Sequence, residues 1–226
     1  MGRENKKETI AALHRSRIMK AAEALFCEKG FDRTTIDDIS KASEYSRRTI
    51  YAYYESKEDI LHHIIEQGLG TLKEELERAV CHGGSVIETY GNICAAMCRY
   101  HRDYPHAASV INGVSSVGFD GGDLSQTVRN ILALGTDING ILTAWIGEEK
   151  KRGTVRKDVV PELTVYVLWS SLTSFLTLAD TKGPYICRQC SVSQDAFLEY
   201  GFLQIFRSIL AEKAELQNFR AGREDA

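Results

Sequence analysis

Three helix starts with capping residues follow one another within about 25 residues near the N-terminus. Thr35 and Asp38 have the spacing of a capping box. Ser46 is a further N-cap residue, and Ser56 with Asp59 repeats the capping-box spacing. Starts this close together belong to short helices joined by tight turns. The pattern therefore predicts a small helical unit that leads into a longer helix.

The segments around these caps have helical periodicity. Apolar residues recur at helical spacing from Lys7 to Lys29, and Gly30 supplies the stop. We expect a second helix from Thr35 that is interrupted at residues 43–44, a third helix over 47–54, and a fourth running from residue 56 towards Val80.

The rest of the chain also favours helix, because its three prolines leave long stretches without a helix breaker. The patterning predicts approximate helices at 85–102, 105–117, 124–151, 161–181 and 193–214. Pro105 and Pro161 suit first-turn positions, and glycines suit the breaks. The expected fold class is all-α with about nine helices.

Charge and hydropathy limit the partners. Residues 1–60 hold 12 Lys/Arg and 11 Asp/Glu, whereas 61–226 hold 16 and 20, so the slightly basic part is N-terminal. No apolar run approaches the roughly 20 residues of a membrane span. The charged N-terminus lacks the apolar core of a secretory signal, and the six cysteines are typical of reduced thiols. These features predict a cytoplasmic protein without a membrane partner.

Two short helices joined by a tight turn fit a helix-turn-helix, whose second helix enters the major groove of DNA. Arg47 and Arg48 begin that helix, where guanidinium groups can reach guanine edges or phosphates. Hydroxyl and basic groups suited to phosphates and base edges surround them, at Ser46, Thr49, Tyr51, Tyr53 and Lys57. The pattern alone leaves open a small helical bundle with no DNA-binding role.

The chain resembles the TetR family of one-component transcriptional regulators over residues 15–65 in a single register. The resemblance is carried by the stretches 17–26, 29–31, 34–40 and 46–58. It implies base or groove contacts from Arg47, Arg48, Thr49, Tyr51 and Tyr53. It implies phosphate contacts from Thr35, Ser46, Tyr51 and Lys57. The family uses the positions of Tyr45, Ile50 and Tyr54 for its core.

Two positions depart from the family's pattern. Glu44 occupies the turn, where the family usually has Gly, and a left-handed conformation costs a non-Gly residue about 1–2 kcal/mol. Either the turn is altered or this strain is tolerated. Arg48 stands where the family often has a small residue, so we expect an operator preference that cannot be taken from relatives.

The resemblance further implies two domains, a DNA-binding domain over 1–60 and a helical effector-binding and dimerisation domain over 61–226. The last two long helices would form a four-helix bundle with those of a second subunit. The implied partners are an operator in double-stranded DNA, a second copy of the chain, and a small-molecule effector that releases a repressor from the operator. An activator and a DNA-binding scaffold without a ligand are the alternatives.

The effector site is the least defined prediction. A mostly apolar pocket with a few polar groups is typical of ligand sites. The candidate lining residues are Tyr100, His101, Tyr104, Asn112, Asn139, Trp145, Trp169 and Thr173. The alternative interpretation places the aromatic residues in the core and the polar ones on the surface.

The cysteines support a second hypothesis, a thiol-responsive or metal-responsive regulator. Cys94, Cys98 and His101 share one helical face by spacing. Cys187 and Cys190 form a C-x-x-C in an expected loop after Gly183-Pro184, which could complete a redox or soft-metal site. No cofactor is expected otherwise. The motifs of metal-dependent and phosphate-binding enzymes are missing from the sequence, so we do not expect an enzyme.

Overall fold

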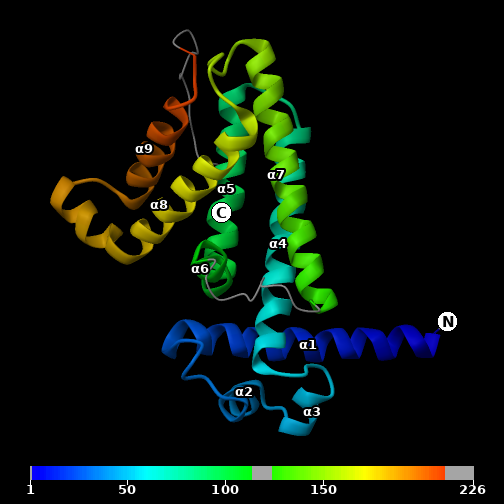
Figure 1. Cartoon of the computed structure of the whole chain (residues 1–226). Helices are drawn as coiled ribbons and strands as arrows, with labels where there is room; N and C mark the ends of the chain where they lie inside the picture. The colour runs from blue at the N-terminus through cyan, green and yellow to red at the C-terminus, as the bar shows by residue number, and fades with distance from the viewer. Residues whose placement is uncertain (1, 114–123, 212–226) are drawn as a thin grey trace. The chain divides into compact units, whose positions relative to one another are not determined.

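The computed structural model describes residues 2–113 and 124–211, and within these ranges the chain forms nine helices and no strand (Figure 1). The predicted all-α fold is confirmed. The helices are α1 (Gly2–Lys29), α2 (Ile36–Ser43), α3 (Arg47–Tyr51), α4 (Lys57–Cys81), α5 (Val86–Asp103), α6 (Pro105–Gly113), α7 (Gln126–Arg152), α8 (Pro161–Cys190) and α9 (Gln194–Arg207).

The chain divides into two compact units. The first holds Met1–Gly68 and Tyr104–Ile131, and the second holds Leu69–Asp103 and Leu132–Ala226. The chain therefore passes from one unit to the other within α4, between α5 and α6, and within α7. Helix α6 belongs to the same compact unit as α1, α2 and α3. The expected division of function near residue 60 stays a prediction.

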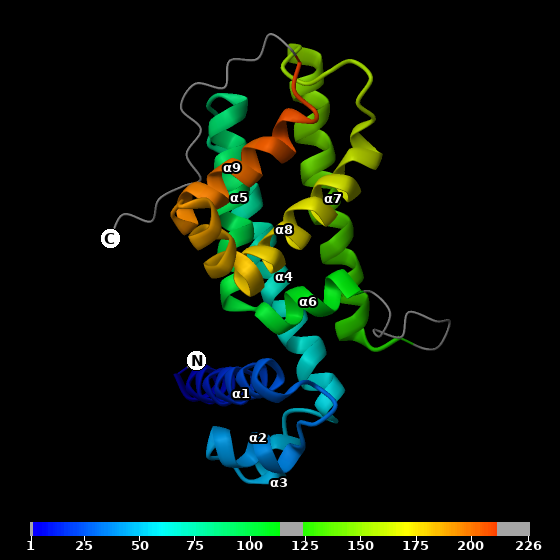
Figure 2. The same cartoon turned by 90° about the vertical axis from the view of Figure 1, so that its left-hand side faces the viewer.

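In the first unit, α2 and α3 pack on the same side of α1 (Figure 2). Their shared core contains Ile18, Phe26, Ile39 and Ile50, which are all almost completely buried. Helix α1 starts at Gly2, earlier than expected, and ends before Gly30, which has the left-handed φ of 85° that favours glycine. Helix α3 is shorter than expected and gives way to a turn after Tyr51.

In the second unit, aromatic residues from three helices form the core. The ring of Tyr90 in α5 stacks on Phe206 in α9, with 4.0 Å between the ring centroids. The Tyr90 hydroxyl donates a hydrogen bond to the carbonyl oxygen of Phe202 at 3.0 Å. Trp145 in α7 also stacks on Phe206, with 6.2 Å between the two ring centroids. These contacts hold α9 against α5 and α7.

Helix α8 corrects one prediction, because it continues through Gly183-Pro184 to Cys190 instead of ending near residue 181. Proline removes one backbone donor from this part of the helix, which lies against the start of α9. The Gln194 amide donates a hydrogen bond to the carbonyl of Ala179 at 3.2 Å, and the Gly183 Cα lies beside the Gln194 side chain. The C-x-x-C therefore lies in the last turn of a helix and not in a loop.

Helix α9 corrects a second prediction, because it ends at Arg207 and not near residue 214. The chain then pairs with the segment that follows α7. The Arg156 amide donates to the Ile209 carbonyl and the Ala211 amide to the Thr154 carbonyl, each at 2.9 Å. The pairing begins two residues after the helix ends. The expected end of the helix at 105–117 lies outside the described residues.

Candidate DNA-binding site and C-terminal cavity

The turn between α2 and α3 keeps the left-handed conformation that the family's glycine would adopt. Glu44 has φ 61° and ψ 22°, so the chain tolerates the strain of a non-Gly residue there. The Glu44 carboxylate accepts a hydrogen bond from Arg17 in α1 at 2.6 Å. Ser40 also donates its hydroxyl hydrogen to the carbonyl of Tyr45 at 2.6 Å. The turn geometry is therefore unaltered and is held from two sides.

The predicted caps of both short helices form. The Thr35 hydroxyl accepts from the Asp38 amide at 3.2 Å, and the Asp38 carboxylate accepts from the Thr35 amide at 2.9 Å. The Ser46 hydroxyl accepts from the Thr49 amide at 3.1 Å and lies 2.9 Å from the Thr49 hydroxyl. Lys29 pairs with Asp38 at 2.6 Å, and it and Thr35 hold the pKa of that carboxyl well below its usual value. Asp38 therefore ties the end of α1 to the start of α2.

Three long side chains on α3 are exposed to solvent. Tyr51 is 55% exposed. Arg47 is paired with Asp37 of α2, and its Nη2 donates to the Asp37 carboxylate at 2.6 Å. Among the residues that the structure describes, none forms a hydrogen bond or ion pair with the exposed Arg48 side chain. These side chains form the surface that a groove-binding helix requires.

Tyr53 and Lys57, both predicted DNA contacts, are engaged inside the unit. The Tyr53 hydroxyl lies 3.0 Å from Nδ1 of His14. Lys57 Nζ donates to the carbonyls of Phe31 and Thr34 at 2.8 and 3.0 Å, and it lies 4.1 Å from the centroid of the Phe31 ring. Each still has to give up or share these partners to reach DNA, and their contacts stay predictions. Ile50 and Tyr54 are buried, as the resemblance implied for core positions.

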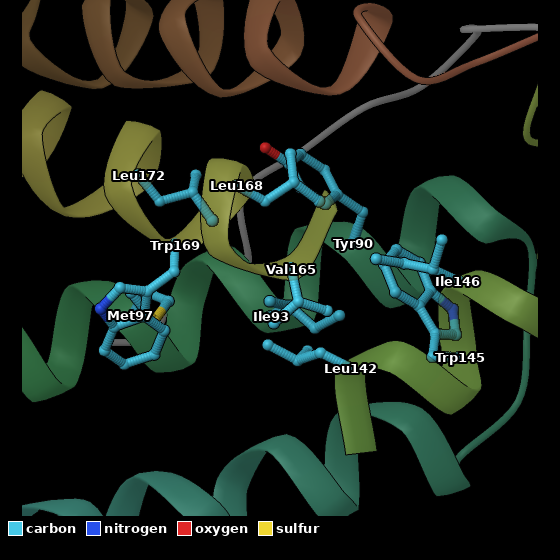
Figure 3. A pocket seen from close by; sticks show the side chains of 10 residues that line it. All are labelled: Tyr90, Ile93, Met97, Leu142, Trp145, Ile146, Val165, Leu168, Trp169 and Leu172. Carbon is cyan, nitrogen blue, oxygen red and sulfur yellow. The ribbon is translucent and has the colours of Figure 1, made fainter. Parts of the chain in front are cut away.

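The second unit contains a small apolar cavity of about 20 Å³ (Figure 3). It is lined by Tyr90, Ile93, Met97, Leu142, Trp145, Ile146, Val165, Leu168, Trp169 and Leu172. In Figure 3 the Tyr90 hydroxyl and both indole nitrogens lie at the periphery of this group. Trp145 Nε1 is buried and has no hydrogen-bond partner among the described residues. The cavity is therefore bounded almost entirely by hydrocarbon and aromatic surface.

Two of the eight predicted pocket residues, Trp145 and Trp169, line this cavity. His101 instead pairs with Asp180 through Nδ1 at 2.9 Å, and Thr173 donates its hydroxyl hydrogen to the Trp169 carbonyl at 2.8 Å. Tyr100 is buried in α5, Asn139 is half-buried in α7, and Tyr104 lies in the first compact unit. The side chain of Asn112 lies outside the described residues. None of these five described residues lines the cavity.

The sequence analysis missed most of the lining. Ile93 and Met97 are one helical turn apart in α5, and Val165, Leu168 and Leu172 follow helical spacing in α8. That periodicity was visible in the sequence. It cannot be distinguished from ordinary core spacing, because residues of a helical core and residues of an apolar pocket share the same periodicity.

The cysteines do not come together as the thiol or metal hypothesis requires. Cys94 and Cys98 lie in α5, and burial raises the pKa of both thiols, that of Cys98 to about 11. A raised thiol pKa disfavours the reactive thiolate. Cys187 and Cys190 lie at the end of α8, and within residues 2–113 and 124–211 no three His, Cys, Asp or Glu side chains are placed to hold a metal ion.

The left-handed turn, the capped recognition helix and its exposed arginines define an all-α helix-turn-helix protein. Residues 18–64 match the family described as "Bacterial regulatory proteins, tetR family". Over these residues the chain is similar to the TetR family of transcriptional regulators.

Similar proteins agree with this assignment. The helix-turn-helix regulator YfiR of Bacillus subtilis is 37% identical over 65 residues, which cover 29% of this chain and 32% of YfiR. The negative regulator IcaR of the biofilm operon icaADBC in Staphylococcus epidermidis is 40% identical over 52 residues, 23% of this chain and 28% of IcaR. The similarity thus spans about a third or less of these relatives.

Solved structures share the fold over most of the chain. The TetR family regulator PfmR of Thermus thermophilus superposes with a TM-score of 0.65 at 24% identity, over 84% of this chain and 97% of PfmR. The ketosteroid regulator KstR2 of Mycobacterium tuberculosis gives a TM-score of 0.69 at 14% identity, over 88% and 95%. At these identities the structures establish the fold.

Proposed function

We propose that the chain is a cytoplasmic, homodimeric repressor that reads an operator through α3 and leaves it when an effector binds the second unit. The observation that carries the first part is the surface of α3, where Arg47, Arg48 and Tyr51 are exposed on a capped helix after a helix-turn-helix turn. Guanidinium groups in this position suit guanine edges and phosphates. IcaR, a relative over 52 residues, is a negative regulator, which favours repression.

The test begins by selecting fragments of the source genome that the full chain retains at physiological salt. The double variant Arg47→Ala with Arg48→Ala is then compared with a control that removes the same charge elsewhere, Arg78→Ala with Arg207→Ala, both exposed. We expect the first variant to lose most operator affinity and the control to lose little. Operator binding that survived the first change would refute the assignment of α3.

Dimer formation is proposed from α8. Leu163, Tyr166 and Val167 are each more than 60% exposed and share one helical face, and Tyr200 of α9 is equally exposed. Such a patch is typical of an interface. Two copies of α3 are also needed to reach two half-sites that lie one DNA turn, about 34–36 Å, apart. Leu163→Asp with Val167→Asp should give a monomer in analytical ultracentrifugation.

A membrane is the other occupant that this face suggests. By length and composition alone, α8 passes as a membrane span, the one such helix in the described part of the chain, and a third of that stretch is buried. Its acidic and basic residues Glu162, Asp180, Lys182 and Arg188 favour the dimer instead. Flotation of the full chain with lipid vesicles would overturn the dimer assignment of this face.

The effector is proposed to be an uncharged, largely apolar molecule, because a charge inside a cavity of hydrocarbon and aromatic surface would be unpaired. The cavity has a volume of only about 20 Å³, so binding must move its lining, and Met97 is the most adaptable lining residue. Among proteins of the same fold, FadR of Bacillus subtilis was solved with stearoyl-CoA, and SmeT with triclosan.

Both tryptophans of the chain line the cavity, so intrinsic fluorescence reports its occupancy. We expect 1-decanol to change this fluorescence and release the operator at lower concentration than decanoate does. Ile93→Phe, which fills the cavity, should weaken the response to 1-decanol. An equal response to both compounds would refute the proposed effector class.

A further inference from the structure

A buried carboxylate from α1 caps the N-terminus of α6. Glu23 is only 9% exposed. Its Oε1 accepts hydrogen bonds from the His106 and Ala107 amides at 3.0 and 3.4 Å. The partners are more than 80 residues apart in sequence, yet they belong to the same compact unit as the helix-turn-helix. The cap is therefore a tertiary contact that holds one helix on another.

The start of α6 needs an acceptor of this kind. The first amide groups of a helix have no partner within the helix. Pro105 in the first position brings no N–H, and Tyr104 before it is not one of the usual N-cap residue types. A negative charge also interacts favourably with the positive end of the helix dipole. Glu23 thus supplies both the acceptor and the charge.

The same contact continues towards the DNA-binding helices. The His106 ring packs on Phe26 and Phe31, with centroid separations of 5.3 and 6.4 Å. The carbonyl of Phe31 accepts from Lys57 at the start of α4, and so does the carbonyl of Thr34, which precedes the N-cap of α2. A row of packed and hydrogen-bonded groups therefore connects α6 with the starts of α2 and α4.

This cap is not simply stabilising. Glu23 Oε2 and His106 Nε2 are both buried without a hydrogen-bond partner among the described residues. Burial also raises the pKa of Glu23. A buried carboxylate with one bare oxygen costs free energy of folding, and an apolar side chain of similar size is often tolerated at such a site. What the carboxylate adds beyond an apolar contact is a directional bond to the first turn of α6.

We propose that Glu23 is a positioning residue that makes α6 respond to operator binding by fixing its first turn to α1. By thermodynamic reciprocity, any displacement of α6 then changes operator affinity. This inference rests on the proposed function, since it requires an operator. It adds a residue and a helix that the proposed function does not include.

The test measures amide hydrogen exchange of the full chain with and without an operator duplex from the genomic selection. Peptides covering the start of α6 are followed in the wild type, Glu23→Ala, Glu23→Met and Glu23→Gln. Glu28→Ala is the matched control, an exposed carboxylate on the same helix. Glu23→Met keeps the size of the side chain and covers the case in which Glu23→Ala does not fold.

In the wild type we expect the operator to slow exchange at the start of α6 by about fivefold or more, the lower range of usual couplings between sites. Glu23→Gln, which keeps an acceptor, and Glu28→Ala should retain this response. Glu23→Ala and Glu23→Met should lose it while still binding the operator. A response that persists in Glu23→Met, or that is missing in the wild type with operator bound, overturns the proposal. If no genomic fragment is retained, the proposed function fails and this proposal falls with it.

Discussion

Gly201 provides the sharpest test of how α8 and α9 pack. A Cβ built on Gly201 would lie 2.5 Å from each Cε atom of the Phe175 ring. That ring has no easy way to move, because it packs against Phe197 and Phe202 with centroid separations of 5.2 and 5.5 Å. Displacing it sacrifices two aromatic pairs worth about 0.5–1.5 kcal/mol each. Gly201→Ala should therefore lower the free energy of unfolding by about 1–3 kcal/mol, the usual range for overpacking.

The matched control is Gly140→Ala in α7, where an added Cβ meets no atom within 4 Å and the glycine is exposed. This change should raise stability by about 0.5–1 kcal/mol, because glycine lowers the stability of a helix interior. Urea unfolding at one fixed protomer concentration compares the variants. Adding Phe175→Leu to Gly201→Ala should recover part of the loss. If Gly201→Ala were as stable as Gly140→Ala, close contact with Phe175 would not be what requires glycine at this position.

Three further predictions concern charged groups. Asp37→Asn frees Arg47 from its ion pair and removes a negative charge beside α3. DNA affinity, measured by filter binding, should therefore rise a few-fold. Asp32→Asn, at an exposed carboxylate, is the control. The pKa of Asp38 is lower in the folded state than its ordinary value of 3.8. The ionised Asp38 side chain therefore stabilises the fold at pH values above 3.8, and this stabilisation is lost as the pH falls through the folded-state pKa. The stability difference between wild type and Asp38→Asn in urea should thus be constant from neutral pH down to about pH 5 and shrink only in stronger acid. The pKa of Glu23 is higher in the folded state than its ordinary value of 4.5. Its favourable contribution to stability is therefore present at pH values below 4.5 and is lost as the pH rises through the folded-state pKa. Glu23→Gln should therefore gain stability relative to the wild type with rising pH, and a constant difference would contradict the assigned burial.

The local features of the fold were predictable from sequence. The caps at Thr35 and Ser46 formed as expected, because a capping side chain reaches only three residues along its own chain. The stop at Gly30 follows from the same local physics. At Glu44 the sequence is compatible with an altered turn or with a strained one, and the φ of 61° shows the strained, left-handed turn.

The helix ends that were predicted wrongly depend on contacts between one helix and another segment of the chain. Helix α8 passes Pro184 because α9 packs against it, and α9 ends where residues 209–211 pair with the segment after α7. The helical periodicity of each segment taken alone does not show these contacts between segments. The cap of α6 by Glu23 has the same origin. The lining of the cavity was missed because core and pocket residues share one periodicity.

The two arginines of α3 should contribute to DNA binding in different ways. Arg47 is already paired with Asp37, so it must exchange one anionic partner for another, and a phosphate is the partner that offers the same charge. Arg48 has no side-chain partner among the described residues, so it can contact a base edge without breaking an ion pair seen in the structure. Arg48→Ala should then cost about 1–3 kcal/mol and relax selectivity at one base pair in a panel of single-base operator variants. Arg47→Ala should weaken all sequences alike and lower the salt dependence by about one unit of slope. If Arg47→Ala changed selectivity and Arg48→Ala changed only the salt slope, the ion pair with Asp37 would not determine which arginine reads the sequence.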